Sequence, residues 1–156
     1  MRLVHIYAFV ILLLDQVSKW IVVHGLNLQN RHEIDVLPPF VNFRMAWNDG
    51  VNFGLGGGGG DIAKYLLIAL ALGISAWVYI WVRKEQPRKL GKIAAGFLIG
   101  GALGNVIDRF RYGAVADFLN MSCCGFENPY SFNVADIAIF IGAFGLILFT
   151  GGKKGA

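Results

Sequence analysis

The stretch IAKYLLIALALGISAWVYIWV, from Ile62 to Val82, decides the fold class of this 156-residue chain. Its one charged residue is Lys64, and a run of about 20 apolar residues is long enough to cross the hydrocarbon core of a bilayer as a helix. Similar runs predict further spans at about residues 3–24, 90–107 and 132–150. We therefore expect a mainly α-helical integral membrane protein, a four-transmembrane-helix bundle in which residues 1–156 form a single membrane domain.

The composition of the chain agrees with a membrane protein. Hydrophobic residues make up 56% of it and charged residues 15%, and the mean hydropathy is +0.56, whereas soluble domains carry about 25% charged residues. Intrinsic disorder is excluded and a soluble globule is disfavoured. The net charge of +4 does not predict a nucleic-acid partner, because the basic residues lie in short clusters rather than in a stripe beside stacking aromatic residues.

The first predicted span also resembles a cleavable signal peptide, since Arg2 precedes a twelve-residue apolar stretch. No small-x-small cleavage site follows this stretch, and Asp15 and Lys19 interrupt the apolar run. We therefore expect a retained membrane helix.

The positions of the basic residues predict the orientation of the spans. Eight of the 14 Lys and Arg residues lie at the amino end, in the connection between the second and third spans, and in the carboxyl-terminal tail, whereas four lie in the other two connections. Basic loops remain in the cytoplasm. Both termini are therefore expected to be cytoplasmic, with residues 25–61 and 108–131 forming outward-facing loops.

The first outward loop contains a hairpin signal. FVNFRMAW (residues 40–47) and VNFGL (51–55) flank Asn48-Asp49-Gly50, and Asp-Gly between alternating apolar residues favours a β-hairpin. We expect a small β-sheet on the outward-facing side.

Glycine forms two patterns. The run Gly56–Gly60 lacks the Lys-Ser/Thr of a phosphate-binding loop and is interpreted as a flexible tether. In the third span, Gly96, Gly100 and Gly104 recur every four residues, which favours close packing of another helix on that face.

Four acidic residues lie in or beside the predicted spans: Asp15, Asp108, Asp117 and Asp136. An ionisable group at the centre of a bilayer costs at least ~2.5 kcal/mol, so such residues mark functional sites by default. In the predicted orientation all four lie toward the outer boundary of the membrane.

These acids could also have a purely structural role instead of a role in a functional site. Asp15 either forms an internal ion pair with Lys19, four residues later, or supports the site. Asp108 either pairs with Arg109 at the end of the third span or acts directly. The basic residues within reach, chiefly Arg109 and Arg111, are too few for four acids, so at least one carboxylate is expected to lack an ion-pair partner.

Two such carboxylates suit aspartic hydrolysis. Held about 3 Å apart in a poorly hydrated place, they share one proton. The ionised group then takes a proton from water while the other donates to a carbonyl oxygen. We expect no metal and no cofactor, because the histidines lie far from the acids in sequence, and adjacent Cys123 and Cys124 are interpreted as incidental loop thiols.

Two other functions are alternatives to hydrolysis. A small proton-coupled membrane transporter or channel subunit would explain buried acids, but it needs titratable groups through both leaflets, and the inner half of the predicted spans has no acidic residue. A non-catalytic assembly protein would explain the glycine face alone.

Five sequence blocks, in this order and spacing, resemble those of the lipoprotein signal peptidases, also called signal peptidase II. The blocks are DQVSK (15–19), NDGVNFG (48–54), GALGNVIDR (101–109), VADF (115–118) and FNVAD (132–136). Asn52 departs from the small residue that many relatives carry, and the glycine run after Leu55 is longer than usual.

The resemblance implies an intramembrane aspartic endopeptidase whose catalytic pair is Asp117 and Asp136. It implies that the supporting residues are Asp15, Asn48, Gly104, Asn105, Asp108, Arg109 and Asn133. For Asn133, N-capping of the fourth span is an equal alternative. Trp47, Phe53 and Tyr130 either line an acyl-chain pocket or form an interfacial aromatic belt.

The implied substrate is a bacterial prolipoprotein with diacylglycerol on its lipobox cysteine, cut on the amino side of that residue. The implied location is the bacterial cytoplasmic (inner) membrane, in contact with membrane lipid and with the active site toward the outer face. The cyclic peptide globomycin is the implied inhibitor.

Overall fold

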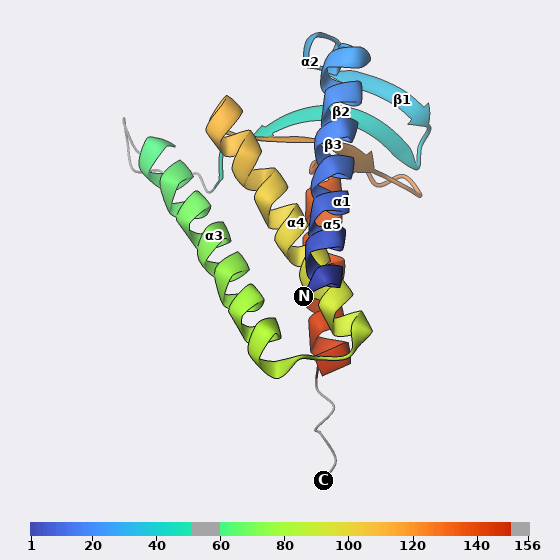
Figure 1. The fold of residues 1–156 in the computed structure, drawn as a ribbon. Helices are drawn as coiled ribbons and strands as arrows, with labels where there is room; N and C mark the ends of the chain where they lie inside the picture. Colours follow the sequence, from blue (N-terminus) through green and yellow to red (C-terminus); the bar gives the residue numbers. More distant parts are fainter. Residues whose placement is uncertain (51–59, 151–156) are drawn as a thin grey trace.

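The computed structural model describes residues 1–50 and 60–150 and is mainly helical, with one small sheet (Figure 1). Its elements in chain order are α1 (Arg2–Lys19), a π-helix η1 (Trp20–Gly25), α2 (Leu28–Arg31), β1 (Glu33–Leu37), β2 (Val41–Asn48), α3 (Gly60–Glu85), α4 (Lys89–Tyr112), β3 (Val115–Met121) and α5 (Val134–Thr150).

Three helical segments are long and apolar enough to cross a membrane. They are Arg2–Gly25, Asp61–Glu85 and Lys89–Tyr112. The fourth predicted span corresponds to α5, which has 17 residues and is the shortest of the four apolar helices. At ~1.5 Å per residue, α5 is about 26 Å long, close to the ~30 Å of a hydrocarbon core.

Helix α4 is the centre of the bundle because α1, α3 and α5 all pack against it. The predicted glycine face is confirmed, and its partner is α1: a Cβ at Gly96 would lie 2.9 Å from the carbonyl oxygen of Val4, and one at Gly100 would lie 2.5 Å from that of Ala8. Gly101 of α4 allows α5 to approach as closely, because a Cβ at Gly101 would lie 2.5 Å from the carbonyl oxygen of Ala135. Backbones at this distance leave no room for a side chain.

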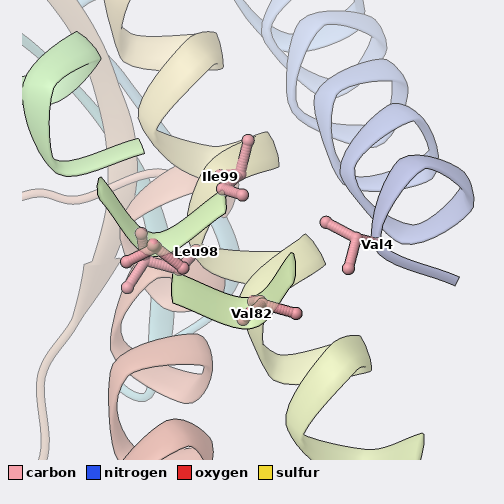
Figure 2. Packing of buried hydrophobic residues seen from close by; sticks show 6 residues of the cluster. Val4, Val82, Leu98 and Ile99 are labelled. Carbon is pink, nitrogen blue, oxygen red and sulfur yellow. The ribbon is translucent and has the colours of Figure 1, made fainter. Parts of the chain in front are cut away.

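A hydrophobic cluster joins α1, α3 and α4. The side chains of Val4, Val82, Leu98 and Ile99 gather there (Figure 2), and Val82 is fully buried. This cluster lies in the part of the bundle away from the sheet, so it fixes the helices without contributing to the polar site described below.

The predicted small sheet is confirmed as three antiparallel strands in the order β1-β2-β3. In β2, Ala46 pairs with Asp117 of β3, and Trp47 pairs with Ala116. The strand expected at residues 51–55 and most of the glycine run lie outside the described residues. The sheet covers one end of the bundle, opposite the α3–α4 connection (Figure 1).

Two boundaries differ from the sequence-based prediction. Helix α4 continues five residues beyond 107 to Tyr112 and is followed by Gly113, whose φ of +81° is left-handed and whose N–H donates to the Arg109 carbonyl. Asp108 therefore lies within the last turns of α4 instead of closing the helix. The first span changes from α- to π-helix at Trp20.

Candidate active site

The four acids of the sequence analysis converge at the end of the bundle that carries the sheet. Asp15 comes from α1, Asp108 from α4, Asp117 from β3 and Asp136 from the first turn of α5. The first three have at most 2% of their surface exposed, and Asp136 is half-buried. Residues more than 100 positions apart in sequence thus meet in one place.

Asp117 is held by amide donors from two directions. It is in β3 opposite Ala46, close to Asn48 at the end of β2. Its Oδ2 accepts a hydrogen bond from Asn48 Nδ2 at 3.0 Å, and its Oδ1 accepts one from Asn133 Nδ2 at 2.6 Å. Both carboxylate oxygens are therefore occupied by neutral donors.

Asp136 is held in the same way at the start of α5. Its Oδ1 accepts from Asn105 Nδ2 at 2.9 Å, and its Oδ2 accepts from the backbone N–H of Asn133 at 3.1 Å. The Asn133 side chain therefore touches Asp117 while its backbone touches Asp136. This one residue links the two carboxylates.

Asn133 both caps α5 and contacts Asp117. As the residue before α5, it caps the helix, since its Oδ1 accepts from the N–H of Asp136 at 2.9 Å. Its remaining amide group points at Asp117. The cap and the contact with the site use different atoms of the same side chain.

The electrostatics of Asp117 are unusual for an aspartate. Burial, followed by the negative charge of Asp136, raises the pKa of Asp117 from 3.8 to about 6, against the opposing effect of its amide donors and of Lys19. In residues 1–50 and 60–150, no salt bridge reaches Asp117 or Asp136. The expectation that at least one acid lacks an ion-pair partner is confirmed for the described residues.

The other two acids share a cation. Lys19 Nζ lies 2.8 Å from Asp15 Oδ2 and 2.7 Å from Asp108 Oδ2, and all three side chains are buried. The predicted Asp15–Lys19 ion pair is confirmed. The alternative in which Asp108 pairs with Arg109 is wrong, because α4 extends past both and adjacent residues on a helix do not face each other.

Gly104 and Arg109 complete the surroundings. A Cβ at Gly104 would lie 2.5 Å from Asp15 Oδ2, so only glycine leaves space for that carboxylate. Arg109 is half-buried and donates to the Asn105 carbonyl at 3.4 Å. Its Nε has no hydrogen-bond partner among the described residues.

Sequence reasoning missed Gln16 as a site residue. Its Nε2 donates to Asp15 Oδ2 at 3.1 Å and to Asp108 Oδ1 at 2.9 Å. A polar residue directly after an intramembrane aspartate was the available signal. Of the proposed aromatic residues, Trp47 packs on Tyr112 with ring centroids 5.4 Å apart, Tyr130 is 76% exposed, and Phe53 lies outside the described residues.

The described residues contain no group of three or more His, Cys, Asp and Glu side chains placed to hold a metal ion. The site contains two carboxylates, Asp117 and Asp136, that are held by hydrogen bonds from amide groups. Paired carboxylates of this kind suit general acid–base hydrolysis.

Comparison with known proteins identifies the family. Residues 7–150 match the model of the family described as signal peptidase (SPase) II. The chain belongs to the signal peptidase II family. Membership makes it an aspartic peptidase and disfavours the transporter or channel alternative.

Curated relatives of this signal peptidase II chain carry the name lipoprotein signal peptidase. The one from Methylobacterium radiotolerans is 44% identical over 137 residues, covering 88% of this chain and 78% of the relative. The one from Rhodopseudomonas palustris is 38% identical over 149 residues, covering 94% and 90%.

Two solved structures described as bacterial membrane enzymes share the fold, each with 25% sequence identity. Their TM-scores are 0.79 and 0.74, and the matches cover 96% and 97% of this chain and 92% of each structure. The chain is therefore an integral membrane protein with the fold of a membrane enzyme.

Proposed function

We propose that this signal peptidase II chain removes the signal peptide from bacterial prolipoproteins that carry diacylglycerol on the lipobox cysteine, cutting on the amino side of that cysteine. The observation that carries this proposal is the link through Asn133, which hydrogen-bonds Asp117 with its side chain and Asp136 with its backbone. The names of the relatives supply the substrate class.

Asp117 and Asp136 are the proposed catalytic residues. One carboxylate takes a proton from the attacking water, and the other donates a proton to the carbonyl oxygen of the scissile bond. The raised pKa of Asp117, about 6, favours its holding a proton at a pH where an ordinary aspartate is ionised. Asp136 lies in the first turn of α5, where the helix dipole favours negative charge.

The supporting residues hold the carboxylates of Asp117 and Asp136 in place, directly or through neighbouring groups. Asn48 and Asn133 hold Asp117, and Asn105 holds Asp136. Asp15 and Asp108 accept hydrogen bonds from the backbone next to this pair, Gly104 leaves space for the Asp15 carboxylate, and Arg109 donates to the Asn105 carbonyl. With the carboxylates fixed before substrate arrives, no reorganisation is required at the moment of reaction.

The proposed setting is the bacterial cytoplasmic membrane, with residues 1–156 as one domain. All four helices α1, α3, α4 and α5 span it, with both termini in the cytoplasm and the sheet outside. The basic residues Arg83, Lys84, Arg88, Lys89 and Lys92 lie around the α3–α4 connection, at the end opposite the sheet (Figure 1). A lipid-anchored precursor would reach the dyad near the outer headgroups.

The test is cleavage of a synthetic diacylglyceryl-modified precursor by the purified protein in detergent. We expect Asp117→Asn and Asp136→Asn to abolish cleavage while remaining folded. Asp35→Asn is the matched control, because Asp35 is an exposed residue of β1 in the same sheet, and it should cleave normally. We also expect inhibition by globomycin. Normal turnover by either dyad variant would rule out the mechanism.

A further inference from the structure

Lys19 is a buried cation to which neither the family resemblance nor the proposed mechanism gives a role. It ends α1 with 6% of its surface exposed. Its ammonium lies within hydrogen-bond distance of Asp15 Oδ2, Asp108 Oδ2 and, at 3.3 Å, Asn105 Oδ1. The ammonium thus donates hydrogen bonds to Asp15 and Asn105 and forms a second ion pair with Asp108.

Each carboxylate paired with Lys19 also holds the backbone next to one catalytic aspartate. Asp15 Oδ1 accepts from the N–H of Ala135 at 3.0 Å, one residue before Asp136. Asp108 Oδ2 accepts from the N–H of Ala116 at 3.2 Å, one residue before Asp117. The cluster around Lys19 therefore contacts both segments that carry the dyad.

The third contact of Lys19 sets the orientation of an amide. An ammonium only donates hydrogen bonds, so it requires the oxygen of Asn105 to face it. With Oδ1 turned toward Lys19, Asn105 Nδ2 points at Asp136 Oδ1, 2.9 Å away. The same oxygen accepts from Asn133 Nδ2 at 3.3 Å. Without the ammonium, the amide loses the charged group that selects this orientation.

We propose that Lys19 is a positioning residue for the dyad: its ammonium anchors Asp15 and Asp108 against the two catalytic segments and turns the donor of Asn105 toward Asp136. This inference rests on the proposed catalytic roles of Asp117 and Asp136. The competing explanation is that Lys19 only neutralises buried charge and stabilises the fold.

The test is Lys19→Met in the full-length protein, purified in detergent and measured with the lipidated precursor. A displacement of about 1 Å in a catalytic group costs on the order of 100-fold in rate, so we expect kcat per folded molecule to fall about 10- to 100-fold. KM should change less than about threefold, because Lys19 is buried and is proposed to act through Asp15, Asp108 and Asn105. The folded fraction is measured by size-exclusion chromatography and thermal unfolding.

The pH profile tests whether the charge of Lys19 acts on the dyad. The charged groups that act on Asp117 are Asp136 from α5, Lys19 from α1 and Arg109 from α4. The charge of Lys19 lowers the pKa of Asp117, so its removal should shift the inflection near pH 6 to higher pH. An unchanged profile would show that the charge of Lys19 does not act on the dyad, whereas the comparison with Asn105→Leu below distinguishes positioning from a purely electrostatic effect.

Lys64→Met is the matched control. Lys64 also lies in a predicted span and pairs with an aspartate, Asp61 Oδ1 at 2.8 Å, but that aspartate is 81% exposed at the side chain. We expect wild-type kcat and pH profile from this variant. If it loses activity as Lys19→Met does, the effect comes from removing any helix cation and the proposal fails.

Asn105→Leu tests the amide directly in a variant that keeps both ion pairs of Lys19 and is therefore expected to fold. It should lose kcat, and the double variant Lys19→Met/Asn105→Leu should lose little more than the worse single variant. Wild-type kcat in Lys19→Met or Asn105→Leu, or strictly additive losses, overturns the proposal. Failure of the wild type to cleave the precursor would instead overturn the proposed function.

Discussion

Asn133 and Asp136 cap the start of α5 reciprocally. The Asn133 Oδ1 accepts from the Asp136 N–H at 2.9 Å, and Asp136 Oδ2 accepts from the Asn133 N–H at 3.1 Å. This is the geometry of a capping box, with the acid at the third helical position. The same atoms that begin the helix therefore fix the carboxylate of Asp136, while the amide of Asn133 remains available for Asp117.

Serine at position 133 should separate the cap from the link. Asn133→Ser keeps an oxygen suited to the N-cap but has no amide to donate to Asp117, whereas Asn133→Ala loses both. We expect Asn133→Ala to be about 1 kcal/mol less stable than Asn133→Ser. Both should lose at least about 10-fold in kcat. Thermal unfolding and initial rates measure the two effects, and wild-type rates in Asn133→Ser would show that the link is dispensable.

Stability should fall with pH because of Asp117. Its pKa is raised to about 6 in the folded protein from an ordinary 3.8, so between these values the folded state binds a proton that the unfolded state has released. The free energy of unfolding therefore decreases as pH rises from about 4 to 6, by at most about 3 kcal/mol.

Asp117→Asn should remove this dependence. Asparagine cannot ionise, so the variant should gain stability relative to the wild type as pH rises to 7, less the loss of one accepted hydrogen bond. Thermal unfolding in detergent from pH 4 to 8 measures the difference. Parallel curves for the two proteins would contradict the raised pKa.

Asp15→Asn should reduce stability more than turnover. The substitution keeps an oxygen for the Ala135 N–H but removes the charge facing Lys19, which still pairs with Asp108. We expect a loss of about 1–3 kcal/mol with turnover per folded molecule within about threefold of wild type.

Asp61→Asn is the control for Asp15→Asn. It breaks the exposed pair with Lys64 and should leave the melting temperature nearly unchanged, because exposed ion pairs contribute little to stability. A large loss of rate in a fully stable Asp15→Asn variant would contradict the assignment of Asp15 mainly to stability.

Patterns within single stretches of the sequence predicted the features that depend only on residues close together in the chain. Apolar runs located the helices, and the four-residue glycine spacing located the face on which α1 packs. The gathering of acids at one end followed from counting residues along the spans. These features depend on neighbours within one element, so a single sequence contains them.

The long-range partners were not predictable in the same way. Asp108 was adjacent to Arg109 in sequence, but its partner is Lys19, on another helix. The rotation of α4 against α1 decides this, and no pattern within either helix encodes it. Gln16 was overlooked for the same reason, since its role comes from bridging Asp15 and Asp108 across that interface.

Gly104 gives the sharpest steric prediction. A Cβ there would lie 2.5 Å from Asp15 Oδ2 and 3.1 Å from its Cγ, so Gly104→Ala must displace the carboxylate that pairs with Lys19. Overpacking of this kind costs about 1–3 kcal/mol, and the displaced carboxylate would release the Ala135 N–H beside Asp136. We expect both a lower melting temperature and a loss of kcat.

Gly73→Ala is the matched variant, because a Cβ at this position of α3 meets nothing within 4 Å. It should leave activity unchanged and be neutral or stabilising by up to about 1 kcal/mol, since alanine favours the helix over glycine. Thermal unfolding and cleavage rates of the two variants are compared in the same detergent. If Gly104→Ala behaves like Gly73→Ala, α1 and α4 have room to separate, and the close approach at Gly104 does not hold Asp15 in place.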